Sequence, residues 1–262
     1  MSALLTVDNI GISFGGLKAV QAFAVEMRAG DLRGLIGPNG AGKTTVFNLL
    51  TGVYQPNQGI ISLGGRRLNG LAPHQITAAG MSRTFQNIRL FGDLSVLDNV
   101  RIACHLRTRS GLSATITRAG GQIGEERAIT ERAMELLAIF GLGDRVDEQA
   151  RNLPYGDQRR LEIARALATF PKVLLLDEPA AGMNPQEKRA LRELIRDIRR
   201  KFELTILLIE HDMGVVMDIC ERITVLDYGQ IIAEGTPAEI QKNPAVIEAY
   251  LGTADAPGVR KE

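Results

Sequence analysis

The stretch Gly37-Pro38-Asn39-Gly40-Ala41-Gly42-Lys43-Thr44-Thr45 decides the interpretation of this chain. The apolar run Leu32–Ile36 before it predicts a strand, and the helical spacing of apolar residues in Lys43–Leu50 predicts a helix. Glycines between a strand and a helix let backbone N–H groups converge on phosphate oxygens, and the helix N-terminus adds its positive dipole end. Lys43 would reach the β- and γ-phosphates, and Thr44 would ligate Mg²⁺. An ordinary glycine-rich turn is less favoured, because strand, loop, Lys-Thr and helix occur together.

A second apolar strand ends in two acidic residues. The run Leu174-Leu175-Leu176 is followed by Asp177 and Glu178. Such strand ends face the phosphate crevice in α/β sheets, so Asp177 is expected to hold Mg²⁺. Glu178 would then orient or deprotonate the attacking water. A strand that ends in acids to cap the next turn is the alternative, and the phosphate-binding loop makes it less favoured.

The composition is that of an ordinary globular domain. The chain has 262 residues, of which 45% are hydrophobic and 23% charged, enough to bury a large core. Its 31 Lys and Arg balance 30 Asp and Glu, whereas proteins that neutralise nucleic-acid phosphates usually carry a larger basic excess. Cys104 and Cys220 have no metal-ligand spacing, and a disulfide framework is not expected.

The apolar pattern changes along the chain. Alternation of Phe23, Val25 and Met27 predicts strands near the N-terminus. Residues 87–157 have helical spacing without alternation, and we expect a helical subdomain inserted into an α/β domain; within it, 107–124 predicts a long exposed loop or a short helix. We therefore expect one domain over residues 1–252, followed by a C-terminal tail. Its parts are an α/β core of 1–86 and 158–252, the inserted subdomain of 87–157, and the tail of 253–262.

Several turns and helix starts can be placed from short motifs. Asn184-Pro185-Gln186-Glu187 predicts a capped helix start, and Thr236-Pro237-Ala238-Glu239 predicts a second one that opens a C-terminal helix. The sequence Asp227-Tyr228-Gly229-Gln230 between two apolar runs predicts a hairpin.

The order of motifs resembles the ATP-binding subunit of an ABC transporter over residues 4–252. The matching elements are the P-loop, Gln86, Leu153-Pro154-Tyr155-Gly156-Asp157, Asp177-Glu178 and His211. The third element takes the place of the family's signature loop, which reads LSGGQ. The resemblance implies an α/β fold: a P-loop NTPase (RecA-like) core with a mainly parallel sheet, an N-terminal antiparallel β subdomain and an inserted helical signature subdomain. It also implies that two such domains trap two ATP molecules, each between the P-loop of one and the signature loop of the other.

The resemblance implies a role for each matching residue, although Phe14, Gln86 and His211 taken alone would be ordinary edge or strand-end residues. Phe14 would stack on adenine, Gln86 would sense Mg²⁺ and water, and His211 would contact the γ-phosphate. The catalytic set is Glu178, His211, Gln86 and Lys43. The metal set is Thr44, Gln86 and Asp177. The nucleotide-binding set is Phe14, Gly37, Pro38, Asn39, Gly40, Ala41, Gly42, Lys43, Thr44, Thr45, Tyr155 and Gly156.

The chain departs from the family's pattern at three positions. Pro154 replaces the serine that hydrogen-bonds the γ-phosphate, and Asp157 replaces a glutamine. The Gly156 backbone and the helix N-terminus still form an anion site. A carboxylate beside a triphosphate is unfavourable unless it points away, so we expect this loop to bind ATP more weakly than usual. Asn184 keeps a capping role where the family usually has Asp, but it lacks the charge that a salt link between subunits requires.

Longer stretches are similar to the ATPases of branched-chain amino acid importers, most of all to the G-type subunit. They include Arg83-Thr84-Phe85-Gln86-Asn87-Ile88-Arg89-Leu90-Phe91 and Gly235-Thr236-Pro237. The similarity implies ATP-driven import of branched-chain or similar hydrophobic amino acids, at the cytoplasmic face of a prokaryotic inner membrane. The implied partners are two transmembrane permease subunits, a second related ATPase (or a second copy in isolation) and, indirectly, a periplasmic substrate-binding protein; no nucleic acid is expected.

Two alternative functions stay open, and the sequence also suggests one docking surface. A lipopolysaccharide-export ATPase would share the C-terminal similarity. A soluble ABC ATPase acting on nucleic acid or the ribosome is less favoured, because no coiled-coil insertion, zinc module or second cassette is visible. For Ile88, packing inside the helical subdomain and exposure on a docking surface both stay open, whereas Leu90 and Phe91 beside Arg89 have the composition of a docking surface.

Overall fold

The structure, a computed structural model, describes residues 3–105 and 121–251. The predicted tail of 253–262 lies outside the described residues, as does most of the segment 107–124, which was expected to be a long exposed loop or a short helix. Residues 121–124 of this segment begin a long helix. The chain divides into two compact units, which are described separately. Unit 1 comprises Met1–Leu71 and Thr205–Glu262, and unit 2 comprises Ala72–Leu204. Among the described residues, no helix has both the length and the apolar character needed to span a membrane.

Unit 1 contains an antiparallel sheet near the N-terminus, in the strand order β2-β1-β4-β5. Its strands are β1 (Leu5–Phe14), β2 (Leu17–Met27), β4 (Gln58–Leu63) and β5 (Arg66–Arg67). Phe23, Val25 and Met27 are buried, and the residues between them are less so, which confirms the predicted alternation. One face of this sheet therefore supplies part of the core.

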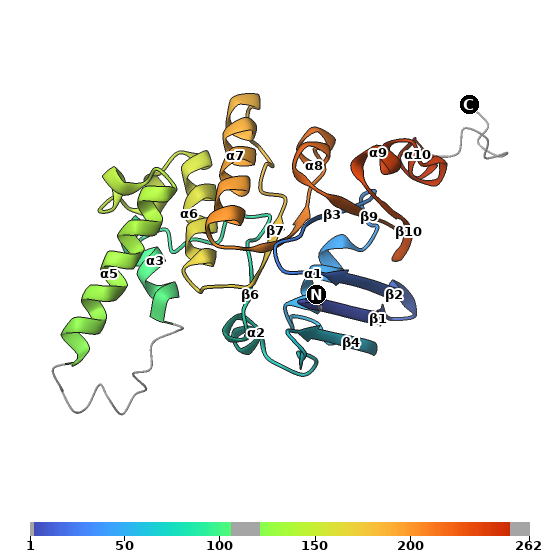
Figure 1. Cartoon of the computed structure of the whole chain (residues 1–262), viewed down its shortest axis with the longest axis horizontal. Coiled ribbons are helices and arrows are strands. Elements are labelled where there is room, and N and C mark those ends of the chain that lie inside the picture. The colour runs from blue at the N-terminus through green and yellow to red at the C-terminus, as the bar shows by residue number, and fades with distance from the viewer. Residues whose placement is uncertain (1–2, 106–120, 252–262) are drawn as a thin grey trace. The chain divides into compact units, whose positions relative to one another are not determined.

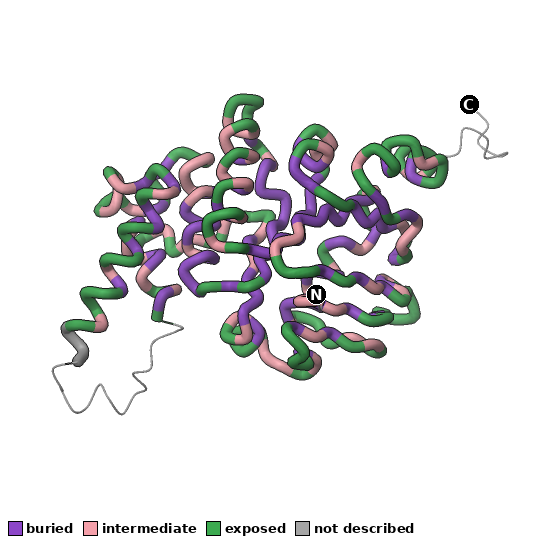
Figure 2. The backbone as a smooth tube through the Cα atoms, viewed as in Figure 1, coloured by how far each residue is buried: buried purple, intermediate pink, exposed green. Residues whose placement is uncertain are grey.

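The same unit holds parallel strands, of which β3 (Leu32–Ile36) and β8 (Thr205–Ile209) are buried along their length (Figure 2). β3 pairs in parallel with both β8 and β9 (Arg222–Asp227), and β9 pairs antiparallel with β10 (Gln230–Gly235), which is only partly buried. The continuous apolar runs of β3 and β8 suit strands that are covered on both faces.

A tight turn joins β9 to β10 and confirms the predicted hairpin. Tyr228 and Gly229 both have positive φ, 42° and 77°, as a two-residue primed turn requires. The Gly229 N–H donates to the Ala41 carbonyl at 2.9 Å, and the Gln21 N–H donates to the Gly229 carbonyl at 2.8 Å. The hairpin turn is thus fixed between β2 and the loop that precedes α1.

The helices of unit 1 are α1 (Lys43–Leu50), α8 (Met213–Ile219), α9 (Pro237–Gln241) and α10 (Pro244–Leu251). α1 has the predicted bounds. Thr236 opens α9 with the predicted capping box, but the single C-terminal helix expected from it is two helices. Pro244 explains the break, because a proline inside a helix lacks the N–H that would bond to the preceding turn.

Unit 2 combines a parallel strand pair with most of the helices (Figure 1). Its strands are β6 (Met81–Arg83) and β7 (Val173–Asp177), and its helices are α2 (Pro73–Ala79), α3 (Val96–Cys104), α5 (Gly121–Ile139), α6 (Tyr155–Leu167) and α7 (Pro185–Lys201), with short 3₁₀ turns at Gly143–Arg145 and Ala150–Asn152. Val100 on α3 and Leu137 on α5 are buried, whereas Ile102 on α3 is 45% exposed. The helices expected in 87–157 all lie within this unit.

Candidate functional site

The loop between β3 and α1 lies in unit 1 and is built around glycines with positive φ. Gly37 has φ 151°, Gly40 80° and Gly42 103°. A Cβ at Gly37 would lie 1.9 Å from the Leu226 carbonyl oxygen, and a Cβ at Gly42 would lie 2.7 Å from the Ala19 carbonyl oxygen. No side chain fits at these distances, so the loop requires glycine at both positions to follow its path beside β9 and β2.

Lys43, the first residue of α1, folds its side chain back over this loop. Its Nζ donates to the carbonyl oxygens of Gly37 at 2.7 Å and Pro38 at 2.8 Å. The side chain is buried, while Thr44 beside it is exposed. The residue before the helix is Gly42, which has no side chain to cap the N–H groups of the first turn. An ammonium and an uncapped helix start together suit the phosphates of a nucleotide.

Two further predicted residues lie in the same unit. Phe14 ends β1, its side chain is 45% exposed, and its ring packs edge-on against Tyr54 with 5.2 Å between ring centroids. An exposed ring of this kind can stack on a base. His211 follows β8 and is exposed. Its backbone N–H donates to the carboxylate of the buried Glu210 at 3.1 Å.

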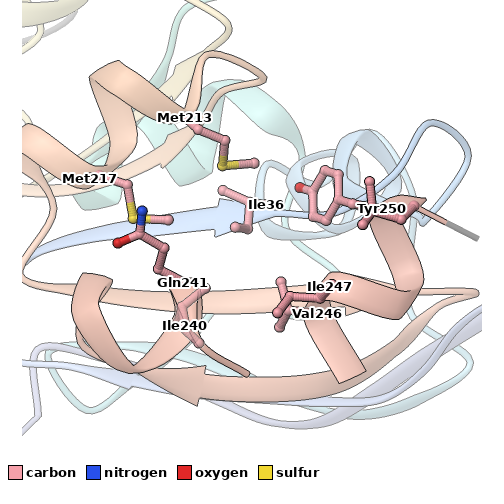
Figure 3. A pocket seen from close by; sticks show the side chains of 9 residues that line it. Ile36, Met213, Met217, Ile240, Gln241, Val246, Ile247 and Tyr250 are labelled. Carbon is pink, nitrogen blue, oxygen red and sulfur yellow. The ribbon is translucent and has the colours of Figure 1, made fainter. Parts of the chain in front are cut away.

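The C-terminal helices form an apolar cavity of about 350 Å³ beside the end of β3 (Figure 3). Met213 and Met217 of α8 line one side, and Ile36 and Tyr250 lie beside them. Partial burial of the Tyr250 ring, which is 40% exposed, raises the pKa of Tyr250 to about 12, and a hydrogen bond from the Gly37 backbone opposes that shift. Helix α10 therefore reaches the first glycine of the phosphate loop, which the sequence did not indicate.

Asp177 ends β7 in unit 2, and its carboxylate is 2% exposed. Arg83 Nη2 donates to Asp177 Oδ2 at 2.6 Å. The other oxygen, Oδ1, is buried and has no hydrogen-bond partner among the described residues. A buried carboxylate oxygen without a donor fits the oxygen ligand that Mg²⁺ prefers, so this residue is suited to hold the metal.

Glu178 follows directly and has a strained backbone. Its φ is 48°, in the left-handed region that non-glycine residues seldom adopt. Gln86 Nε2 donates to Glu178 Oε2 at 2.8 Å. The structure thus brings together two residues that lie 92 positions apart and were both expected to contact the attacking water. Strain of this kind is often found where a functional side chain must be aimed.

The predicted signature loop opens α6 in the same unit. Pro154 is the N-cap and offers no side-chain acceptor, while Tyr155 is 45% exposed. Asp157 lies within 3.5 Å of Arg145 and 3.7 Å of Arg160, measured between carboxylate oxygen and guanidinium nitrogen. These two cations offset the charge that was expected to disfavour a triphosphate here.

Asn184 caps α7 as predicted. Its side-chain oxygen accepts the N–H groups of Gln186 at 2.9 Å and Glu187 at 3.0 Å. The Glu187 carboxylate accepts the Asn184 N–H at 2.8 Å, which completes the capping box.

A buried ion pair on α6 was missed by the sequence analysis. Arg159 and Glu162 are 0% and 2% exposed, and Arg159 Nη1 lies 2.8 Å from Glu162 Oε2. Burial raises the pKa of Glu162, and the positive charge of Arg159 opposes that rise. The sequence signal was the i,i+3 spacing of opposite charges, which on most helices marks a solvated face.

Comparison with known proteins shows which families the chain is similar to. Residues 20–181 match the family model described as ABC transporter, and residues 230–256 match the model described as branched-chain amino acid ATP-binding cassette transporter. The high-affinity branched-chain amino acid transport ATP-binding protein LivG of Salmonella typhimurium is 49% identical over 96% of this chain and 98% of its own length. BraF of Pseudomonas aeruginosa, with the same description, is 44% identical over 96% and 98%.

Two further similarities bear on the alternatives. The lipopolysaccharide export system ATP-binding protein LptB of Haemophilus influenzae is 33% identical over 95% of this chain and 98% of its own. Among solved structures, the ADP conformation of MJ1267, an ATP-binding cassette of an ABC transporter, has a TM-score of 0.84 and 30% identity, covering 96% of this chain and all of that one.

Proposed function

This chain belongs to the family of ABC transporter ATP-binding subunits, and on that premise we propose that it hydrolyses ATP to power the import of branched-chain or similar hydrophobic amino acids. The proposed class of solute rests on the sequence identity of this chain to relatives of different function. Proteins described as branched-chain amino acid transport ATP-binding proteins reach 44–49% identity over 96% of the chain, whereas the lipopolysaccharide-export relative reaches 33%.

The phosphate loop binds the nucleotide. Its backbone N–H groups and Lys43 neutralise the phosphates, and the exposed ring of Phe14 stacks on adenine. Thr44 and Asp177 would hold Mg²⁺, which when bound offsets negative charge on the phosphoryl oxygens. His211 donates to the γ-phosphate. Tyr155 and Gly156 at the start of α6 face the ATP of a second ATPase subunit.

Glu178 performs the proton chemistry. Its carboxylate accepts a proton from water as the water oxygen attacks the γ-phosphorus and the bond to the bridging oxygen breaks. The Gln86 amide, 2.8 Å from Glu178 Oε2, keeps the carboxylate aimed at that water. General-base removal usually costs a factor of about 10²–10⁴ in rate.

The partners follow from the same premise. They are two transmembrane permease subunits, a second related ATPase and, indirectly, a periplasmic substrate-binding protein, with this chain held at the cytoplasmic face of the membrane. Phe91 supports a docking role: its side chain is 49% exposed, and the buried Asn99 fixes its backbone through hydrogen bonds at both N–H and carbonyl.

Uptake of labelled leucine tests this proposal. Cells that lack the chain should regain uptake when they produce the wild-type chain, and should not when they produce an equal amount of the Glu178→Gln variant. Unchanged leucine uptake without the chain, together with loss of lipopolysaccharide from the cell surface, would favour the export alternative.

A further inference from the structure

Helix α6 carries a charged pair where apolar residues would be expected. The guanidinium of Arg159 is completely buried, and Glu162 one turn later is 2% exposed. Burial of two charges is costly, and an apolar pair of similar volume often stabilises a fold as well or better. The contacts that the two side chains make with other residues therefore have to account for their burial.

Its contacts converge on one irregular backbone segment, residues 85–89. Arg159 Nη1 donates to the Phe85 carbonyl at 2.6 Å, and Nη2 donates to the Gln86 carbonyl at 2.7 Å. Glu162 Oε1 accepts the N–H groups of Phe85 at 3.3 Å and Arg89 at 3.2 Å. Backbone groups in a helix or sheet would bond to one another, but here one ion pair satisfies four of them.

The segment held in this way carries Gln86, whose side chain reaches Glu178. The backbone carbonyl of Gln86 accepts a hydrogen bond from Arg159, and its side-chain amide donates one to Glu178 at 2.8 Å. A guanidinium that donates to adjacent carbonyls fixes direction as well as distance, because its N–H groups form a rigid fork. A shift of the segment would move the amide away from the carboxylate.

The same guanidinium also contacts the start of α6. Arg159 Nη2 lies 3.2 Å from the Tyr155 hydroxyl, and Tyr155 is the first residue of the helix. We propose that Arg159 and Glu162 are positioning residues, which hold Gln86 against Glu178 and connect that contact to the signature loop at the start of α6. The proposal rests on ATP hydrolysis as the proposed function.

The test uses the purified full-length chain with ATP and Mg²⁺. The double variant Arg159→Met/Glu162→Leu removes all four backbone contacts without leaving a buried charge. Arg159→Lys keeps the charge but not the fork. The matched control is Arg33→Met/Glu234→Gln, which removes another pair with a buried arginine, between β3 and β10. Each variant is assayed for thermal melting, ATP affinity, kcat and KM.

We expect the double variant to lose about tenfold or more in kcat while its ATP affinity stays within about twofold, with Arg159→Lys in between and the control unchanged. In a Gln86→Ala background the double variant should cause less than about twofold further loss, because residues that act through one group are not additive. A purely structural role would lower the melting point and add to Gln86→Ala in full.

The proposal is overturned if the folded double variant keeps wild-type kcat, or if its loss multiplies with that of Gln86→Ala. If the double variant does not fold, Glu162→Gln takes its place, because it keeps the side-chain volume and an acceptor oxygen. Its loss of kcat is then compared with and without Gln86→Ala in the same way. Lys43→Ala separates the two claims: if it retains wild-type hydrolysis, the proposed function itself fails, whatever Arg159 does.

Discussion

Gly37 and Gly40 share a positive φ but have different surroundings. A Cβ at Gly37 would lie 1.9 Å from the Leu226 carbonyl oxygen, whereas a Cβ at Gly40 meets nothing within 4 Å. The first position is limited by space and the second only by backbone conformation. Glycine is therefore required at Gly37 because no side chain fits there, and at Gly40 because of the positive φ alone.

We predict that Gly37→Ala weakens ATP binding by tenfold or more and lowers the melting temperature, because the loop must move away from β9. Gly40→Ala is the matched control. It should lower the free energy of unfolding by only about 1–2 kcal/mol, the strain of a non-glycine residue in the left-handed conformation. ATP titration and thermal melting check both. Equal effects of the two variants would show that contact with Leu226 does not set the path of the loop.

Single functional residues could be predicted from the sequence where their type and their spacing both indicate the same chemistry. The glycine pattern and Lys43 predict a phosphate loop, and the bonds from Lys43 to the Gly37 and Pro38 carbonyls agree with a loop built around that side chain. Arg159 and Glu162 could not be predicted in this way. Their burial depends on an irregular segment more than 70 positions earlier in the chain, and no periodicity on α6 records that contact.

At the scale of elements, local signals predicted a capped helix start and a hairpin turn, but missed a short helix. The Asn184 capping box and the Tyr228-Gly229 turn were predictable because each depends on four neighbouring residues. Helix α8 was missed, since its seven residues are too few for a period of 3.6 to show, although Asp212 caps it by accepting the Val215 N–H.

The cap of α7 gives a prediction at this scale. Asn184→Ala should lower the free energy of unfolding by about 1 kcal/mol, because two N–H groups of the first turn lose their acceptor. Asn184→Asp should retain the stability, since a carboxylate can accept both bonds and also interacts favourably with the helix dipole. Urea denaturation measures the difference; equal losses in both variants would contradict the capping role.

At the scale of the whole molecule, the predicted roles are divided between the two units. The phosphate loop and His211 belong to unit 1, while Gln86, Asp177, Glu178 and the signature loop belong to unit 2. Unit 2 also carries the exposed Phe91, whose backbone is held by Asn99 and whose ring lies 5.4 Å from the Arg165 guanidinium carbon. This unit thus combines the proposed catalytic base with the proposed permease contact.

We predict that Phe91→Ala leaves folding and ATP binding intact but abolishes co-purification with the permease subunits, since such truncations cost roughly 2 kcal/mol or more of binding. The matched control is Phe170→Ala, because Phe170 is a second exposed ring in the same unit with an arginine, Arg132, over it. A large fall in melting temperature with co-purification preserved would make Phe91 a core residue instead.

The most direct test of the central claim is the rate of ATP hydrolysis by the Glu178→Gln variant, measured together with its affinity for ATP. The substitution keeps the size of the side chain and removes only its capacity to take a proton. We predict that ATP still binds within about threefold of the wild-type affinity, while turnover falls by about a hundredfold or more. Wild-type turnover in this variant would contradict the assignment of Glu178 as the base that drives hydrolysis.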